Sequence, residues 1–206
     1  MFVASPLPVL LCFVNWLAHL LLSEPCPAFK IGNVLPDLVR PPDLAGLPEK
    51  YQRGIRQHLR IDAYTDSHPV VHRSILRLGP DFRRYGGILT DMFYDHFLCR
   101  QWSRFSPQPL AEFTAQFYTE FKDHRHELPM NALPPLDGMS KWDWLGSYGD
   151  LESLEKTLSR IGRRFKKPVY LAGAMPLFLR EYDRLQQDFA EFFPDLQKEV
   201  SGVSSP

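Results

Sequence analysis

Apolar residues recur at the spacing of an α-helix along nearly the whole chain, and no convincing stretch shows the period-two alternation of a strand. In the segment 110–128, Phe113, Phe117 and Phe121 recur every fourth residue, which puts three aromatic rings on one helical face. Gly and Pro divide the chain into segments of ordinary helix length. The pattern therefore predicts an all-α fold, a single-domain bundle of seven or eight helices.

The expected helices follow from these breaks and from the local apolar phase. A helix from Pro69 should be capped by Ser67 or His68, since proline suits the first turn. The proline-rich segments 40–48 and 129–138 are predicted to be loops. The predicted helical segments are 9–22, 31–39 (a turn or short helix), 49–66, 69–78, 88–105, 110–128, 151–165 and 175–200.

The composition excludes several classes of protein. The 206 residues suit one domain of ordinary size, and 44% hydrophobic residues suffice for a sizeable core. Lys and Arg balance Asp and Glu at 24 each, which argues against a basic nucleic-acid binder and an acidic tail protein. Three widely spaced cysteines, Cys12, Cys26 and Cys99, form no disulfide framework, which fits a cytoplasmic location.

The apolar segment Val9 to Leu22 is shorter than the roughly 20 residues that span a bilayer. No Lys or Arg precedes it, which argues against a signal peptide. We expect a buried helix rather than stable insertion into a membrane. Residues 1–14 are expected to be a flexible extension or the start of the first helix, residues 15–200 the helical domain, and residues 201–206 a disordered tail.

Histidine and aspartate side chains interrupt helices that otherwise have the pattern of a core. His58, Asp62 and Asp66 follow one another at i, i+4 and i+8, so they line one stripe of a helix. Asp91, Asp95 and His96 lie in the aromatic-rich segment 88–105, and His19 and Asp37 come from two further segments. Buried carboxylates are costly unless they are paired or bound to metal. Imidazole with carboxylate suits Mn²⁺, Fe²⁺ or Zn²⁺, whereas a structural zinc site usually includes thiolates.

Each of these residues also has an alternative interpretation without a metal. His19 could be a hydrogen-bonded core histidine, and Asp62 or Asp66 could form an ion pair with a nearby arginine. Asp91 could stabilise the start of its helix. The concentration of such residues in four segments is what favours a metal site.

The same residues resemble the acyl carrier protein phosphodiesterase family. The resemblance rests on NWLAHLLL, GNVLPDLV, GIRQHLRIDAYTDSHPVV and GGILTDMFYDHFLCRQWSRFS. It is detailed from Asn15 to Phe105 and continues more loosely to about Pro194. The resemblance implies an HD-domain-like helical hydrolase that removes 4′-phosphopantetheine from holo acyl carrier protein and leaves a free serine. It further implies a divalent metal, with Mn²⁺ favoured over Mg²⁺, Fe²⁺ or Zn²⁺.

The resemblance also assigns roles to residues of this chain. The metal ligands it implies are His19, Asp37, His58 and Asp95. Arg60 is a candidate for binding phosphoryl oxygens, with a surface ion pair as the alternative. The residues expected to orient ligands or to act as general acid or base are Asp62, Asp66, Asp91 and His96.

An acidic carrier protein as partner would need basic surface on this neutral chain. Two clusters qualify: Arg160, Arg163, Arg164, Lys166 and Lys167, and Arg73, Arg77, Arg83 and Arg84. Two other functions stay open at this point: a related metal phosphohydrolase acting on a small phosphoester or nucleotide, and a non-catalytic helical binding module. The sequence does not specify an oligomeric state.

Overall fold

A computed structural model describes residues 15–202, and over this range every regular element is a helix and no strand occurs. The expected all-α fold is thus confirmed. Seven of the α-helices have nine or more residues, and shorter helices connect them. The α-helices are α1 Trp16–Leu21, α2 Pro27–Gly32, α3 Pro41–Ala45, α4 Glu49–Ser67, α5 Pro69–Arg77, α6 Gly79–Phe82, α7 Gly86–Arg100, α8 Leu110–His124, α9 Leu133–Trp142, α10 Trp144–Ser147, α11 Leu151–Arg163, α12 Met175–Arg180 and α13 Tyr182–Ser201. The 3-10 helices are η1 Leu35–Asp37, η2 Arg83–Tyr85, η3 Trp102–Arg104, η4 Arg125–Glu127, η5 Met130–Ala132 and η6 Leu171–Ala174.

Two predicted loops were wrong. The segment 40–48 contains α3, and the segment 129–138 contains η5 and the first half of α9. In both cases two prolines lie in the first turn of a helix, Pro41 and Pro42 in α3 and Pro134 and Pro135 in α9, where no intrahelical N–H bond is lost, so they start helices rather than prevent them.

Other boundaries moved by smaller amounts. The predicted last helix is divided into α12 and α13, and α13 extends to Ser201 with Gly202 as its cap. The helix predicted over 88–105 starts at Gly86 and ends at Arg100. As expected, α5 starts at Pro69, and the His68 side chain accepts a bond from the Val70 N–H. Predictions for residues 1–14 and 203–206 lie outside the described residues.

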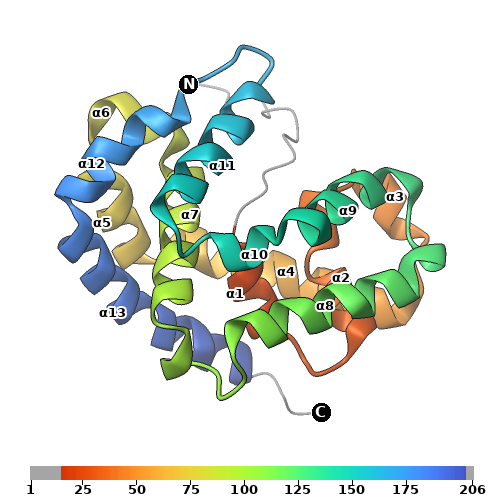
Figure 1. Cartoon of the computed structure of the whole chain (residues 1–206). Helices are drawn as coiled ribbons and strands as arrows, with labels where there is room; N and C mark the ends of the chain where they lie inside the picture. The colour runs from red at the N-terminus through yellow and green to blue at the C-terminus, as the bar shows by residue number, and fades with distance from the viewer. Residues whose placement is uncertain (1–14, 203–206) are drawn as a thin grey trace, which may run out of the picture.

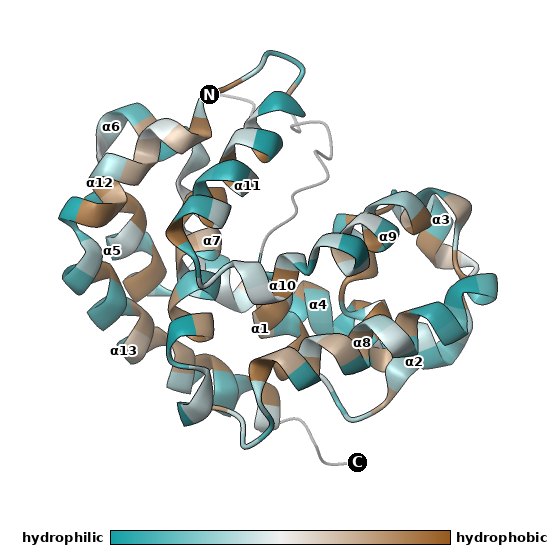
Figure 2. Cartoon of the chain, viewed as in Figure 1, coloured by the Kyte–Doolittle hydropathy of each residue, from teal (hydrophilic) through white to brown (hydrophobic). Residues whose placement is uncertain are grey.

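Two groups of helices lie side by side in Figure 1, with α5, α6, α12 and α13 on one side and α2, α3, α8 and α9 on the other. Between them, α4 contacts α2 as well as α5 and α13, and α1 packs against α7. In Figure 2 brown, hydrophobic positions alternate with teal, hydrophilic ones along the longer helices. A core cluster of buried residues extends from Trp16 to Leu196. None of the described helices has both the length and the apolar character needed to span a membrane.

Helices α2 and α4 touch backbone to backbone. A Cβ atom at Gly54 would lie 2.1 Å from the Phe29 carbonyl oxygen, and one at Gly32 would lie 2.2 Å from the Tyr51 carbonyl oxygen. Two glycines therefore permit this close contact. It places Asn33, the residue after α2, against the middle of α4.

An ion-pair network joins α5 to α13. The buried Asp188 carboxylate accepts hydrogen bonds from Arg73, Arg77 and the Ser74 hydroxyl at 2.7–3.3 Å. Burial opposes the charge of Asp188, but these three donors outweigh it and hold the pKa of the carboxyl below its usual value. The network orients Arg73 and Arg77, two arginines of a basic cluster that was expected from the sequence to be a docking surface.

This network predicts how stability depends on pH. Because the folded pKa of Asp188 is lowered, its contribution is present above the unfolded value of about 4 and is lost as the pH falls through the folded value. We expect Asp188→Asn to cost about 1–2 kcal/mol at pH 7, because both arginines are partly exposed. Urea denaturation should show this cost shrinking from pH 7 to pH 3. A cost independent of pH would contradict the prediction, and Asp183→Asn at an exposed position of α13 is the control.

Candidate metal centre

Two buried histidine rings from different helices stack on each other. His19 of α1 and His58 of α4 have ring centroids 4.3 Å apart and planes inclined by 22°. Both side chains are almost completely inaccessible to solvent. Their Nε2 atoms lie 3.2 and 3.1 Å from the two carboxylate oxygens of Asp62. The predicted i, i+4 pair His58–Asp62 thus meets a histidine from another helix.

Asn33 fixes the orientation of both rings. Its side-chain oxygen lies 3.0 Å from His19 Nδ1, and its backbone carbonyl lies 2.8 Å from His58 Nδ1. The amide nitrogen of Asn33 donates to the His19 carbonyl and to the Ser23 hydroxyl, so the side-chain oxygen must face the ring. A carbonyl oxygen can only accept, so both Nδ1 atoms carry hydrogen. Both Nε2 atoms are therefore directed at Asp62.

Asp37 adds a second carboxylate from η1. One of its oxygens lies 3.5 Å from His58 Nε2, and the other accepts a 2.8 Å hydrogen bond from the indole N–H of Trp16. The residue thus faces the cluster from the side opposite the backbone of α4. Three of these residues could hold a metal ion together, since one ligand atom from each of His19, His58 and Asp62 lies within 4.8 Å of the other two.

The charges of the cluster are strongly coupled. Burial opposes protonation of His58, but hydrogen bonds to Asp37 and Asp62 outweigh it and raise its pKa to about 10. Burial would raise the pKa of Asp62, yet the two histidines lower it well below its usual value. Burial raises the pKa of Asp37 although His58 opposes the shift. A cation is thus favoured between the imidazoles and the carboxylates, a position that a proton fills when no metal is bound.

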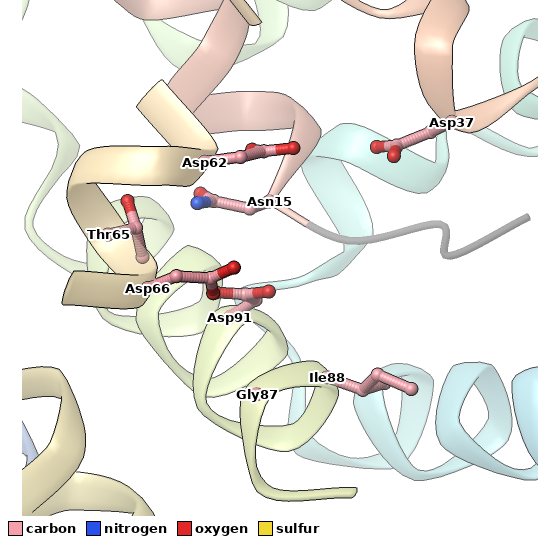
Figure 3. A pocket seen from close by; sticks show the side chains of 8 residues that line it. All are labelled: Asn15, Asp37, Asp62, Thr65, Asp66, Gly87, Ile88 and Asp91. Atoms are coloured by element: carbon pink, nitrogen blue, oxygen red, sulfur yellow. The ribbon is translucent and has the colours of Figure 1, made fainter. Parts of the chain in front are cut away.

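A pocket of about 250 Å³ opens next to these residues. Figure 3 shows Asp37, Asp62, Asp66 and Asp91 lining it together with Asn15. The carboxyl groups of Asp66 and Asp91 lie next to each other in this view. Burial, then Asp62, Asp66 and the other nearby carboxylates, raise the pKa of Asp91 well above its usual value. We call this the acidic pocket.

Comparison with known proteins identifies the family. The family model described as acyl carrier protein phosphodiesterase matches residues 14–196. The chain belongs to this family. Curated relatives named acyl carrier protein phosphodiesterase include one from Serratia proteamaculans, 31% identical over 91% of this chain and 97% of its own length. A relative from Escherichia coli is 30% identical over 91% and 98%, and one from Yersinia pestis is 28% identical over 91% and 97%. No solved structure matches the chain.

The resemblance to the family predicts that Asp95 is a metal ligand. In the structure Asp95 lies outside the group of His19, His58 and Asp62. Its two carboxylate oxygens accept hydrogen bonds from the backbone N–H groups of Leu17 and Ala18 at 3.1 and 3.2 Å. It therefore caps the start of α1 from a neighbouring helix, as an N-cap residue would from within the helix. Burial raises its pKa to about 7 although these two N–H groups oppose the shift. Asp95 thus binds the first turn of the helix that carries His19.

Two further candidates also lie away from the cluster. His96 Nδ1 is 2.9 Å from the Tyr148 carbonyl and its Nε2 is 3.0 Å from the Tyr182 hydroxyl, so protein groups engage both ring nitrogens. Arg60 forms hydrogen bonds and an ion pair with Glu199 of α13, as the alternative interpretation had it. Successive helical residues are 100° apart, and Arg60 therefore lies on a different face of α4 from His58 and Asp62.

Sequence reasoning missed three residues that shape the site: Asn15, Trp16 and Asn33. Asn15 precedes α1 in a left-handed conformation, with φ of 68°, which asparagine adopts more readily than most residues. Asn33 lies in the quoted GNVLPD motif. The signal available in the sequence was an asparagine four residues before Asp37. Only the contacts of Asn33 reveal that it orients two histidines.

The donor set fits a divalent ion. Two imidazole nitrogens and a carboxylate are ligands that Mn²⁺, Fe²⁺ and Zn²⁺ accept, and bond lengths of about 2.1 Å place ligand atoms about 3–4 Å apart. Asn33 supplies the hydrogen-bond acceptor that metal-binding histidines usually have on their second nitrogen. His19, His58 and Asp62 would hold the ion, with Asp37 as a fourth ligand.

Proposed function

We propose that this family member is a divalent-metal-dependent phosphodiesterase that removes 4′-phosphopantetheine from holo acyl carrier protein. Family membership makes the chain a phosphodiesterase, a hydrolase whose substrate is acyl carrier protein. The observation that carries the metal dependence is the pair of stacked histidines whose Nε2 atoms meet the carboxylate of Asp62. Convergence of imidazole and carboxylate from separate helices also supports kinship with HD-domain phosphohydrolases.

Mn²⁺ is the ion we propose, with Mg²⁺, Fe²⁺ and Zn²⁺ as alternatives for the same ligands. A bound divalent ion lowers the pKa of a water molecule and stabilises negative charge on a phosphoryl oxygen. The oxygen of water bonds to phosphorus, the bond from phosphorus to the serine oxygen breaks, and that oxygen takes a proton. The products are apo carrier protein and 4′-phosphopantetheine.

The acidic pocket supplies groups for proton transfer. Burial and the neighbouring carboxylates raise the pKa of Asp91 well above its usual value, which favours its protonated form and suits it to be the donor to the serine oxygen. Burial and Asp62 also raise the pKa of Asp66, the more exposed of the two, which suits it to accept the proton of the attacking water.

A basic surface lies next to the acidic pocket. The ring centroids of Tyr85 in η2 and Phe165 after α11 are 5.2 Å apart. This contact places η2, with the exposed Arg83 and Arg84, near the end of α11. Directly after η2, Gly87 and Ile88 line the acidic pocket. Arg73 and Arg77 form ion pairs with Asp188 and do not contribute to this basic surface. The basic surface thus comprises Arg83, Arg84, Arg160, Arg163, Lys166 and Lys167, and we propose that the acidic carrier protein docks there, in the cytoplasm.

Intact mass measurement of the carrier protein tests this function. Incubation of holo acyl carrier protein with this chain and Mn²⁺ should lower the carrier mass by one phosphopantetheine group, and chelation of the metal should prevent the loss. An unchanged carrier mass, with turnover of a small diester such as bis(p-nitrophenyl) phosphate, would instead identify a small-molecule phosphohydrolase.

The same assay tests the docking surface. Charge attraction across an interface is screened by salt, so kcat/KM should fall several-fold between about 0.05 and 0.5 M salt. Lys166→Glu should lower kcat/KM at low salt, whereas Lys122→Glu, an exposed lysine on α8, should leave it unchanged. Equal effects of the two substitutions would contradict docking at the basic surface.

A further inference from the structure

A second hollow of about 410 Å³ shares Asp37 and Asp62 with the acidic pocket but has different walls. Prolines and aliphatic side chains dominate its lining: Pro36, Pro41, Leu44, Ala45, Ile55 and Leu59. We call it the apolar groove. Its volume falls in the range of pockets that hold small organic ligands. Because Asp37 and Asp62 line both hollows, a ligand in the groove would reach the candidate metal centre.

We propose that the apolar groove binds the pantetheine arm of the substrate, an inference that rests on the proposed function. A phosphodiester has two substituents, and here one is a carrier-protein serine and the other is the uncharged arm. Gly87 and Ile88 of the acidic pocket follow the exposed Arg83 and Arg84 of the basic surface in the chain, so that side suits the acidic carrier protein. The apolar groove meets the acidic pocket at Asp37 and Asp62 and suits the arm, which carries a gem-dimethyl group close to its phosphate.

The length and chemistry of the groove agree with this occupant. Gln52, Ile55, Leu59 and Asp62 are spaced at i, i+3, i+7 and i+10, so one face of α4 forms the floor. At 1.5 Å per residue this face extends about 15 Å from Gln52 to Asp62, enough for most of an extended arm.

The side chain of Gln52 in the groove is positioned to form a hydrogen bond with an amide group. The Gln52 amide nitrogen donates to the carbonyl of Leu44 at 2.6 Å and to that of Leu47 at 3.3 Å. With its nitrogen committed to these carbonyls, the side-chain oxygen of Gln52 can accept an N–H. The arm has two amide groups that could donate one. Apolar walls with a few placed polar groups are typical of sites for such ligands.

Filling the groove tests the proposal. Ala45 is exposed at the edge of the groove, so Ala45→Trp can occupy the space without disturbing the core. We expect it to lower kcat/KM for holo carrier protein by about tenfold or more, since lost ligand contacts of this size cost that much. Leu59→Glu should act in the same direction. Its matched control is Leu76→Glu on α5, because Leu59 and Leu76 are 58% and 59% exposed and only Leu59 lines the groove.

A direct measurement of pantetheine binding distinguishes failure of this proposal from failure of the proposed function. Ligand-observed NMR with free pantetheine should detect binding to the wild-type protein and to Leu76→Glu, and a loss of binding in Ala45→Trp. Absence of pantetheine binding to the wild type, or equal binding to wild type and Ala45→Trp, would overturn the proposal. Should the wild type bind pantetheine in the groove but fail to hydrolyse holo carrier protein, the proposed function fails and the groove assignment stands.

Discussion

Asp62→Asn should abolish the metal centre while preserving the fold. Asp62 is the one carboxylate within 3.2 Å of both histidine Nε2 atoms in the described part of the chain, and it lies at the edge of the pocket rather than in the core. An amide has the same shape but lacks the charge that a divalent ion requires. We expect Mn²⁺ affinity and kcat/KM for holo carrier protein each to fall by at least about 100-fold, beyond the usual cost of losing a residue that only supports a ligand.

Calorimetric titration with Mn²⁺ and thermal unfolding measure this outcome. Mn²⁺ should raise the melting temperature of the wild-type protein and not that of Asp62→Asn. Asp183→Asn makes the same chemical change at an exposed position of α13 and should behave as wild type. If Asp62→Asn fails to fold, His19→Gln serves as the second variant. Unchanged Mn²⁺ affinity in a folded Asp62→Asn protein would show that the ligand assignment is wrong.

Gly54→Ala should strongly destabilise the protein and also weaken the site. The added Cβ would lie 2.1 Å from the Phe29 carbonyl oxygen and 2.8 Å from the Asn33 nitrogen, and both are backbone atoms that cannot rotate away. Helices α2 and α4 must therefore separate, at a cost of about 3 kcal/mol. The same movement would take the Asn33 carbonyl away from His58 Nδ1.

Urea denaturation measures the first effect, and Mn²⁺ titration of the folded fraction measures the second. Gly46→Ala is the matched control, because nothing lies within 4 Å of a Cβ atom there and φ is −88°. A free energy of unfolding for Gly54→Ala within 0.5 kcal/mol of wild type, about the size of a neutral surface substitution, would mean that α2 and α4 are not in backbone contact in solution.

The family also bears on how the candidate residues are distributed. Residues 15–105 contain the motifs by which the sequence resembles other members, and they supply the histidines and aspartates of the metal centre and the acidic pocket. The later helices contribute the Tyr148 carbonyl that contacts His96 and the α13 partners of Arg60 and Arg73.

Local periodicity by itself determined most of the longer helices and the stripe of α4 that carries His58 and Asp62, because residues four apart on a helix share a face whatever surrounds them. Only the tertiary structure decided which buried aspartates meet the histidines. Asp95 and Asp37 both follow apolar residues, yet one caps α1 and the other faces His58, because the packing of helices far apart in sequence sets the direction of each side chain. The pairing of Gly32 with α4 and the double contact of Asn33 have the same origin: they depend on distances between helices, which no local pattern encodes.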